Sequence, residues 1–202
     1  MKNYICINEV KTELTDKQVG KVKKLLGLKE QRLSEVPVGQ AVRIGDHVMI
    51  VLEHSGDTTA VICKKPYRKD VPFGKNNNYN GSNVDKICEE LADELASIIG
   101  EENIVMHTVD LTTDDGLKDY GKIRRRASAM TADRQRRYVD ILDEYKLDIW
   151  TWLATAFSTK KHGNDSWVKC VSPSGFVGNI YYSSVNIGVR PFCILKSNIF
   201  VS

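Results

Sequence analysis

The chain has 202 residues, with 29 Lys or Arg against 26 Asp or Glu, a formal net charge of +3, and 42% apolar residues. This balance predicts one globular domain of roughly 150 to 200 residues with a small appendage, and it excludes a disordered or fibrous chain. Its apolar runs are too short to cross a bilayer, which takes about 20 residues, and residues 1–4 carry no secretory signal. We therefore expect a cytoplasmic protein with no membrane partner.

The first predicted element is an amphipathic helix. Thr15 and Gln18 form a Thr-x-x-Gln capping box, apolar residues follow at helical spacing, and Gly27 ends the segment. Lysines occupy the opposite face, which suits nucleic acid, although a solvated lysine face is the commoner explanation. We expect residues 1–36 to form an N-terminal helical appendage to a core domain of residues 37–202.

After this appendage the apolar periodicity changes from that of a helix to that of strands. Residues 41–44, 47–53 and 58–64 are separated by turns that contain glycine, and they predict a three-stranded meander. A loop rich in Pro, Gly and Asn follows. A second helix is then predicted to begin after Ser82, to end at Gly100 and to pack on the sheet.

Charge is distributed unevenly in the middle of the chain. Residues 85–119 hold eleven acids and two bases, whereas residues 120–138 hold seven bases and one acid. The arginines form two clusters that lie two to three turns apart at helical spacing, and they suit phosphate groups or an acidic protein surface. Internal pairing with the acidic segment is an equal alternative. The clusters consist of Arg124, Arg125, Arg126, Arg134, Arg136 and Arg137.

The last third of the chain concentrates aromatic, Ser, Asn and Lys residues in short strands separated by turns. Rigid aromatic side chains beside adaptable polar ones are typical of a recognition surface, although core packing is the alternative for each aromatic. Arg190 is expected to make a buried ion pair that stabilises the fold. The predicted ligand-binding residues are Trp152, Phe157, Lys160, Lys161, His162, Trp167, Tyr181 and Tyr182.

The sequence gives no positive sign of catalysis, so we expect no catalytic residues, no cofactor and no metal site. A Ser-x-x-Lys pattern at residues 158–161 lacks its partner motifs, and the four histidines are scattered. The aspartates at 110, 114, 115 and 119 lack the register of a calcium loop, which favours a solvated turn. The five cysteines show no C-x-x-C spacing, so buried free thiols are expected at Cys63, Cys88, Cys170 and Cys193.

Several motifs follow one another in a fixed order over roughly residues 38–198. They are the hairpin entry at 42–53, Asn80-Gly81-Ser82-Asn83-Val84, Asp110-Leu111-Thr112, Asp119-Tyr120-Gly121, Thr131-Ala132, Trp150 to Leu153, and Gly188-Val189-Arg190-Pro191. This order resembles an uncharacterised domain family of bacteria, their phages and mobile elements. The resemblance implies an α+β, C-type-lectin-like fold, as in formylglycine-generating-type domains and the variable proteins of diversity-generating retroelements. In such folds the tryptophan segment and the final Gly-x-Arg strand frame a ligand face.

The resemblance implies a non-enzymatic binding protein of a phage or mobile element, acting in the bacterial cytoplasm. The calcium signatures of sugar-binding lectins and the reactive cysteine pair of formylglycine formation are both missing from the sequence. We expect a macromolecular ligand, a protein in the first place, and inhibition of a host defence component such as a CRISPR nuclease, with residues 85–119 as a phosphate mimic. The alternative is nucleic-acid binding through the arginine-rich segment 122–137, and an enzyme on the same fold ranks last.

Overall fold

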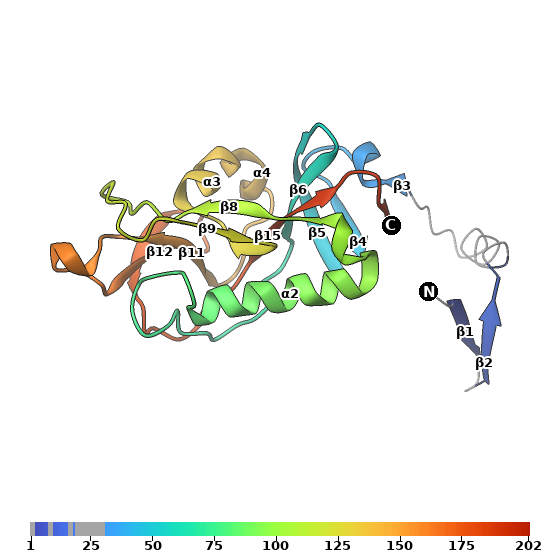
Figure 1. Ribbon diagram of the computed structural model, residues 1–202, viewed down its shortest axis with the longest axis horizontal. Coiled ribbons are helices and arrows are strands. Elements are labelled where there is room, and N and C mark those ends of the chain that lie inside the picture. The colour runs from blue at the N-terminus through green and yellow to red at the C-terminus, as the bar shows by residue number, and fades with distance from the viewer. Residues whose placement is uncertain (1–2, 8–9, 16–17, 19–30) are drawn as a thin grey trace.

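Two β-sheets and one long helix dominate the fold (Figure 1). The computed structural model describes residues 3–7, 10–15, 18 and 31–202. Three α-helices and several sheets lie among these residues, which confirms the predicted α+β class.

The larger sheet is built on the predicted meander. Its strands are ordered β10-β15-β6-β5-β4, β7 also pairs with β15, and all neighbours are antiparallel. The middle of β5 is buried on both faces, as its unbroken apolar run predicts. The strands are β4 (Ala41–Ile44), β5 (His47–Ser55), β6 (Thr58–Cys63), β7 (Ile104–Val105), β10 (Ala127–Ala129) and β15 (Pro191–Lys196).

Helices cover both faces of this sheet (Figure 1). On one face α2 (Asn83–Ile99) packs against a cluster that includes Met49 of β5. On the other face α3 (Ala132–Arg137) and α4 (Val139–Asp143) pack against a cluster that includes Ile50. The sheet therefore separates two apolar clusters.

The boundaries of α2 agree with the prediction. The Ser82 hydroxyl accepts a hydrogen bond from the Asp85 backbone N at 3.1 Å and caps the helix. Val84, Cys88 and Leu91, among others, recur at helical spacing and are buried. Gly100 has a φ of 89°, which only glycine adopts without strain, and it ends the helix. A short 3₁₀ turn, η2 (Glu101–Asn103), follows.

The smaller sheet has the order β13-β12-β11-β14, in which β14 runs parallel to β11. A separate ribbon pairs β8 with β9, and the loop between β11 and β12 contains a 3₁₀ turn, η3 (Lys160–His162). The strands are β8 (His107–Asp110), β9 (Lys122–Arg125), β11 (Trp150–Ala156), β12 (Trp167–Val171), β13 (Val177–Tyr181) and β14 (Ile187–Gly188).

Residues 31–36 belong to the core. β3 (Gln31–Arg32) pairs with β16 (Phe200–Val201), and η1 (Leu33–Glu35) follows directly. Leu33 and Val36 are buried in the cluster that contacts α2. The core thus includes residues 31–36, which the sequence assigns to the appendage, because two apolar side chains in this short segment reach the interior.

The segment before residue 31 contains a hairpin that the sequence does not predict. β1 (Asn3–Ile7) and β2 (Val10–Leu14) pair antiparallel. The Thr15 backbone N donates to Gln18 Oε1 at 2.8 Å, as the capping box predicts. The predicted helix that would follow lies outside the described residues.

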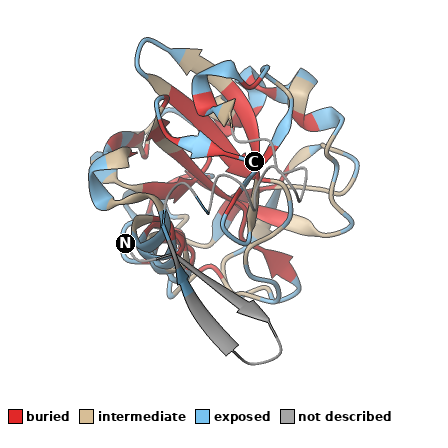
Figure 2. Cartoon of the chain, turned by 90° about the vertical axis from the view of Figure 1, so that its right-hand side faces the viewer, coloured by how far each residue is buried: buried red, intermediate tan, exposed pale blue. Residues whose placement is uncertain are grey.

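Buried residues gather on the strands, and exposed residues lie on the turns around them (Figure 2). Within the part of the chain that the structure describes, no helix is both long enough and apolar enough to span a membrane.

Candidate ligand-binding surface

Three aromatic side chains stack at one end of the β12–β13 pair. Trp167 and Tyr181 are register partners whose ring centroids lie 5.9 Å apart at an interplanar angle of 89°. Tyr181 also stacks on Tyr182, with centroids 4.8 Å apart. Trp167 and Tyr181 are each 42% exposed. Because these rings already restrict one another, they provide contact area for a ligand and lose little side-chain conformational entropy when it binds.

The loop between β11 and β12 continues this aromatic stack. The Phe157 backbone N donates to the Trp167 carbonyl O at 2.9 Å, which places exposed Phe157 beside the tryptophan. Lys160, Lys161 and His162 form η3 and are all exposed. In Figure 1 this loop, in orange, lies at the end of the molecule opposite the C-terminus. We call the seven predicted residues that share this end the aromatic–lysine surface: Phe157, Lys160, Lys161, His162, Trp167, Tyr181 and Tyr182.

Asn77 fixes this loop from the inside. Its side chain is fully buried, and Nδ2 lies 2.9 Å from the Ser158 carbonyl O, 3.2 Å from that of Trp167 and 3.4 Å from that of Asn164. The Tyr120 hydroxyl donates to Asn77 Oδ1 at 2.6 Å. One buried amide thus satisfies backbone groups at both ends of the loop. The asparagine-rich run predicts a loop here, but it gives no signal for this role of Asn77.

The acidic turn that precedes β9 provides a second anchor. Thr159 Oγ1 donates to Asp119 at 2.9 Å, and Lys161 Nζ lies 3.8 Å from the same carboxylate. Asp110 accepts from Lys122 and Thr112, and these hydrogen bonds lower its pKa to about 2. Among the described residues, no group of three or more His, Cys, Asp or Glu side chains is placed to hold a metal ion.

Trp152 does not belong to the aromatic–lysine surface. It is 1% exposed, its Nε1 donates to the Val71 carbonyl O at 2.7 Å, and its ring packs edge-on against Phe73 at 5.4 Å. The prediction that Trp152 contacts ligand is therefore wrong. β11 is buried on both of its faces, so its alternate residues do not divide into a core face and a solvent face.

The first arginine cluster lies in and just after strand β9 rather than on a helix, so the expected helical spacing is wrong. Arg125 binds Asp85 through two bonds, Nε to Oδ1 at 2.8 Å and Nη2 to Oδ2 at 2.7 Å. Arg126 pairs with three carboxylates of the acidic segment at 2.7 to 3.1 Å: Glu89, Asp93 and Glu101. Arg124 is exposed, with no ion pair to the described residues. Internal pairing is thus what the structure shows for two of the three.

The second arginine cluster is also engaged within the protein. Arg134 lies 4.6 Å above the ring of Phe192 and donates to the Thr108 carbonyl O at 3.0 Å. Arg136 pairs with Asp114 at 3.1 Å, and Arg137 pairs with Glu53. Arg125, Arg126, Arg136 and Arg137 each pair with a carboxylate, and Arg134 is held by a carbonyl oxygen and an aromatic ring, so most of this region offers neither an unpaired arginine patch nor an unpaired acidic face.

The described thiols are buried and free, as predicted, at Cys63, Cys88, Cys170 and Cys193. Burial raises the pKa of Cys63 and of Cys170 to about 12. Cys170 lies in the smaller sheet and Cys193 in the larger one. A thiol that stays protonated is a poor nucleophile.

Arg190 does not make the buried ion pair that was predicted. It is 9% exposed, and its Nε donates to the Cys63 carbonyl O at 2.8 Å. Its Nη2 is buried without a hydrogen-bond partner, and no described carboxylate lies within ion-pair distance of it. Loss of solvent lowers the pKa of this guanidinium to about 10, so it stays charged at neutral pH.

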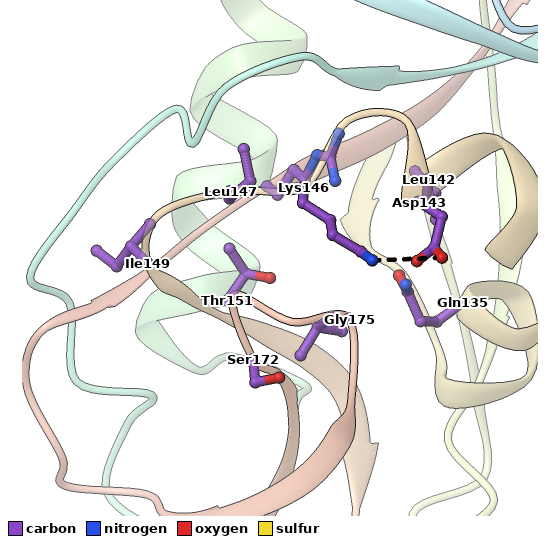
Figure 3. Close-up of a pocket in the computed structure, with 11 residues that line it drawn as sticks. Gln135, Leu142, Asp143, Lys146, Leu147, Ile149, Thr151, Ser172 and Gly175 are labelled. Atoms are coloured by element: carbon purple, nitrogen blue, oxygen red, sulfur yellow. Dashed lines mark ion pairs between the residues drawn. The ribbon is translucent and has the colours of Figure 1, made fainter.

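Arg190 lines a cavity of about 20 Å³ between α3, α4 and the smaller sheet (Figure 3). Gln135, from α3, and Thr151, from β11, also line it and are themselves buried. Lys146 and Asp143 lie at the cavity and pair with each other at 3.4 Å. Sequence patterns gave no signal for this convergence, because its members come from four separate segments.

Comparison with family models, with curated proteins and with solved structures gives no match to this chain. The geometry of the aromatic–lysine surface and of the Arg190 cavity is therefore what bears on function.

Proposed function

We propose that this chain is a non-enzymatic binding module that holds a protein ligand on the aromatic–lysine surface. One observation carries the proposal: exposed Trp167 and Tyr181, stacked with half-buried Tyr182, stand beside a lysine-bearing loop that Asn77 anchors. Tryptophan and tyrosine dominate the energetically important centres of protein interfaces. Exposed lysines at the rim favour a partner with acidic groups, because they steer its approach and its orientation.

The arrangement of the rings favours a protein over a single-stranded nucleic acid. Bases bind by stacking on free ring faces, one after another along a basic groove. Here one face of Tyr181 is taken by Tyr182, and Trp167 meets Tyr181 at 89°. The alternative site for nucleic acid, the arginine-rich segment 122–137, has lost support because five of its six clustered arginines are engaged within the protein.

The motif resemblance supports a narrower version of this proposal. On that version the chain has a C-type-lectin-like fold, comes from a phage or mobile element and acts in the bacterial cytoplasm. Its protein target is then a host defence component, such as a CRISPR nuclease, that it inhibits. The contact surface is the aromatic–lysine surface rather than the acidic residues 85–119, because arginines neutralise several of those carboxylates.

Calorimetric titration of a purified partner, first isolated by affinity capture from the native host, tests the surface. The double variant Trp167→Ala with Tyr181→Ala is expected to weaken binding by about 30-fold or more, since loss of interface hot spots costs roughly 2 kcal/mol or more. Phe176→Ala is the matched control: Phe176 is 67% exposed but lies at the opposite end of the β12–β13 hairpin. Unchanged affinity in the double variant, or an equal loss in the control, would reject the surface.

Nucleic-acid binding is tested separately by fluorescence anisotropy with single-stranded and duplex DNA and RNA at rising salt. We expect no binding at moderate salt. Affinity that falls steeply with salt and is lost in Arg124→Ala would instead favour the arginine-rich segment, because released counterions give phosphate contacts their salt dependence.

A further inference from the structure

The Arg190 cavity brings together three buried polar side chains that have unused hydrogen-bond donors. Arg190 Nη2 has no partner. The side chains of Gln135 and Thr151 are more than nine-tenths buried and make no hydrogen bond to the described residues. Buried polar groups are paired in the great majority of proteins, so the unpaired Arg190 Nη2, with the side chains of Gln135 and Thr151 beside it, indicates a ligand that accepts hydrogen bonds.

The charge at the cavity indicates that this ligand is an anion. Arg190 is a buried cation, and the one acidic side chain among the residues that line the cavity, Asp143, pairs with Lys146 instead. Cys63, whose carbonyl oxygen Arg190 contacts, keeps a neutral thiol because burial raises its pKa to about 12. A buried charge without a counter-charge is strongly unfavourable, and a bound anion removes that cost.

The enclosed part of the cavity suits a very small anion. Its volume of about 20 Å³ has room for one particle of about the size of a water molecule. A phosphate or sulfate, with four oxygens around a central atom, does not fit in this space. A single halide ion does, and it accepts hydrogen bonds from several directions at once.

We propose that the cavity lined by Arg190, Gln135 and Thr151 is a binding site for a small monovalent anion, chloride in the cell. The ion accepts from the guanidinium of Arg190, from the amide of Gln135 and from the hydroxyl of Thr151. Because Arg190 follows β14, Gln135 lies on α3 and Thr151 lies on β11, the ion ties together three segments that the chain itself does not connect through side-chain bonds at this point.

Thermal unfolding in a chloride series at constant ionic strength, with gluconate as the replacing anion, tests the site. A ligand that binds only the folded state raises the Tm in proportion to the logarithm of its concentration above Kd. We expect chloride and bromide to raise the Tm by several degrees and gluconate to leave it unchanged. A Tm that is the same in chloride and gluconate would overturn the proposal.

Two variants keep the test independent of whether loss of Arg190 disrupts folding. Gln135→Glu places a carboxylate where the anion is proposed to lie, so its Tm is expected to lose its dependence on chloride and to exceed that of the wild type in gluconate. Arg124→Gln is the matched control. This arginine is exposed and does not line the cavity, so the variant is expected to keep the full chloride response.

Crystals grown with bromide provide the direct observation. An anomalous peak in contact with Arg190 and Gln135 supports the site. A chloride-dependent Tm that persists in Gln135→Glu, or bromide peaks only at surface lysines, would overturn it.

Discussion

His107 shows how burial acts on a single titratable group. It is almost fully buried, its Nε2 lies 3.0 Å from Ser128 Oγ, and its ring packs edge-on against Phe192 at 5.2 Å. Burial, and then the positive charge of Arg134, lower its pKa from 6.5 to about 3. The imidazole therefore remains neutral over the whole physiological range.

Acid is expected to destabilise the protein through this residue. In the unfolded chain His107 takes up a proton as the pH falls below 6.5, whereas in the folded protein it does so only near pH 3. The stability it contributes is present above pH 6.5 and is lost at about 1.4 kcal/mol per pH unit below that. Urea unfolding at several pH values between 7.5 and 4.5 should show a slope of this size that His107→Gln lacks. Parallel curves for the two proteins would contradict the expectation.

Residues differ in how far the sequence could predict their role. Trp167 and Tyr181 were predicted as surface residues because they lie among turn signals, and both are exposed. Trp152 lies in a segment of similar composition, but Val71 and Phe73, in a loop distant along the chain, cover it. Local sequence patterns do not report such contacts. The role of Asn77 gave no sequence signal for the same reason, since the carbonyl groups that its side chain binds lie more than 80 residues away along the chain.

At the scale of elements, the prediction was accurate where the information is local. α2 carries its own cap, its own apolar stripe and its own glycine stop, and the meander strands are joined by short turns. β9 was mistaken for part of a helix because its four residues hold a single apolar side chain, Ile123, and its strand character comes from pairing with β8. Short strands of this kind are defined by their neighbours rather than by their own sequence.

The start of α2 depends on one buried carboxylate, Asp85. It accepts two bonds from Arg125 and a third from the Gly81 backbone N at 2.9 Å, so it joins the helix to β9 and to the loop before it. Asp85→Ala is expected to lower the free energy of unfolding by about 3–5 kcal/mol, because it leaves a partly buried guanidinium without its partner. Chemical denaturation measures this loss.

Asp93→Ala provides the matched comparison for Asp85. Asp93 is also on α2 and also pairs with an arginine, Arg126, but its side chain is 70% exposed. Its loss is expected to cost no more than about 1 kcal/mol, since solvent screens the pair and two other carboxylates remain on Arg126. Similar losses in the two variants would show that the burial of Asp85 does not increase the contribution of its ion pair to the free energy of unfolding.

At the scale of the whole molecule, the two ends of the described core hold each other. β3 pairs with β16, and Leu33 and Val36 fill space in the cluster beneath α2. Burial of each of these two apolar side chains stabilises the fold by roughly 2 kcal/mol.

Two truncations test where the core begins. Removal of residues 1–36 takes away β3 and both buried side chains, and it is expected to lower the free energy of unfolding by several kcal/mol relative to removal of residues 1–30. Calorimetry or urea unfolding of the two truncated chains measures the difference. Equal stabilities would place the start of the core at residue 37, as the sequence alone predicts.

The position of β15 in the larger sheet affects how the chain reaches its fold. This strand lies between β6 and β10, so residues 191–196 must pair with residues 58–62 and 127–129 before the sheet is continuous. During synthesis on the ribosome, β6 and β10 are therefore made long before their shared partner and keep hydrogen-bonding edges that other chains can join. Closure over such long sequence separations is slow. The nascent protein thus passes through a stage in which the centre of the sheet has open edges, and such edges are prone to aggregation.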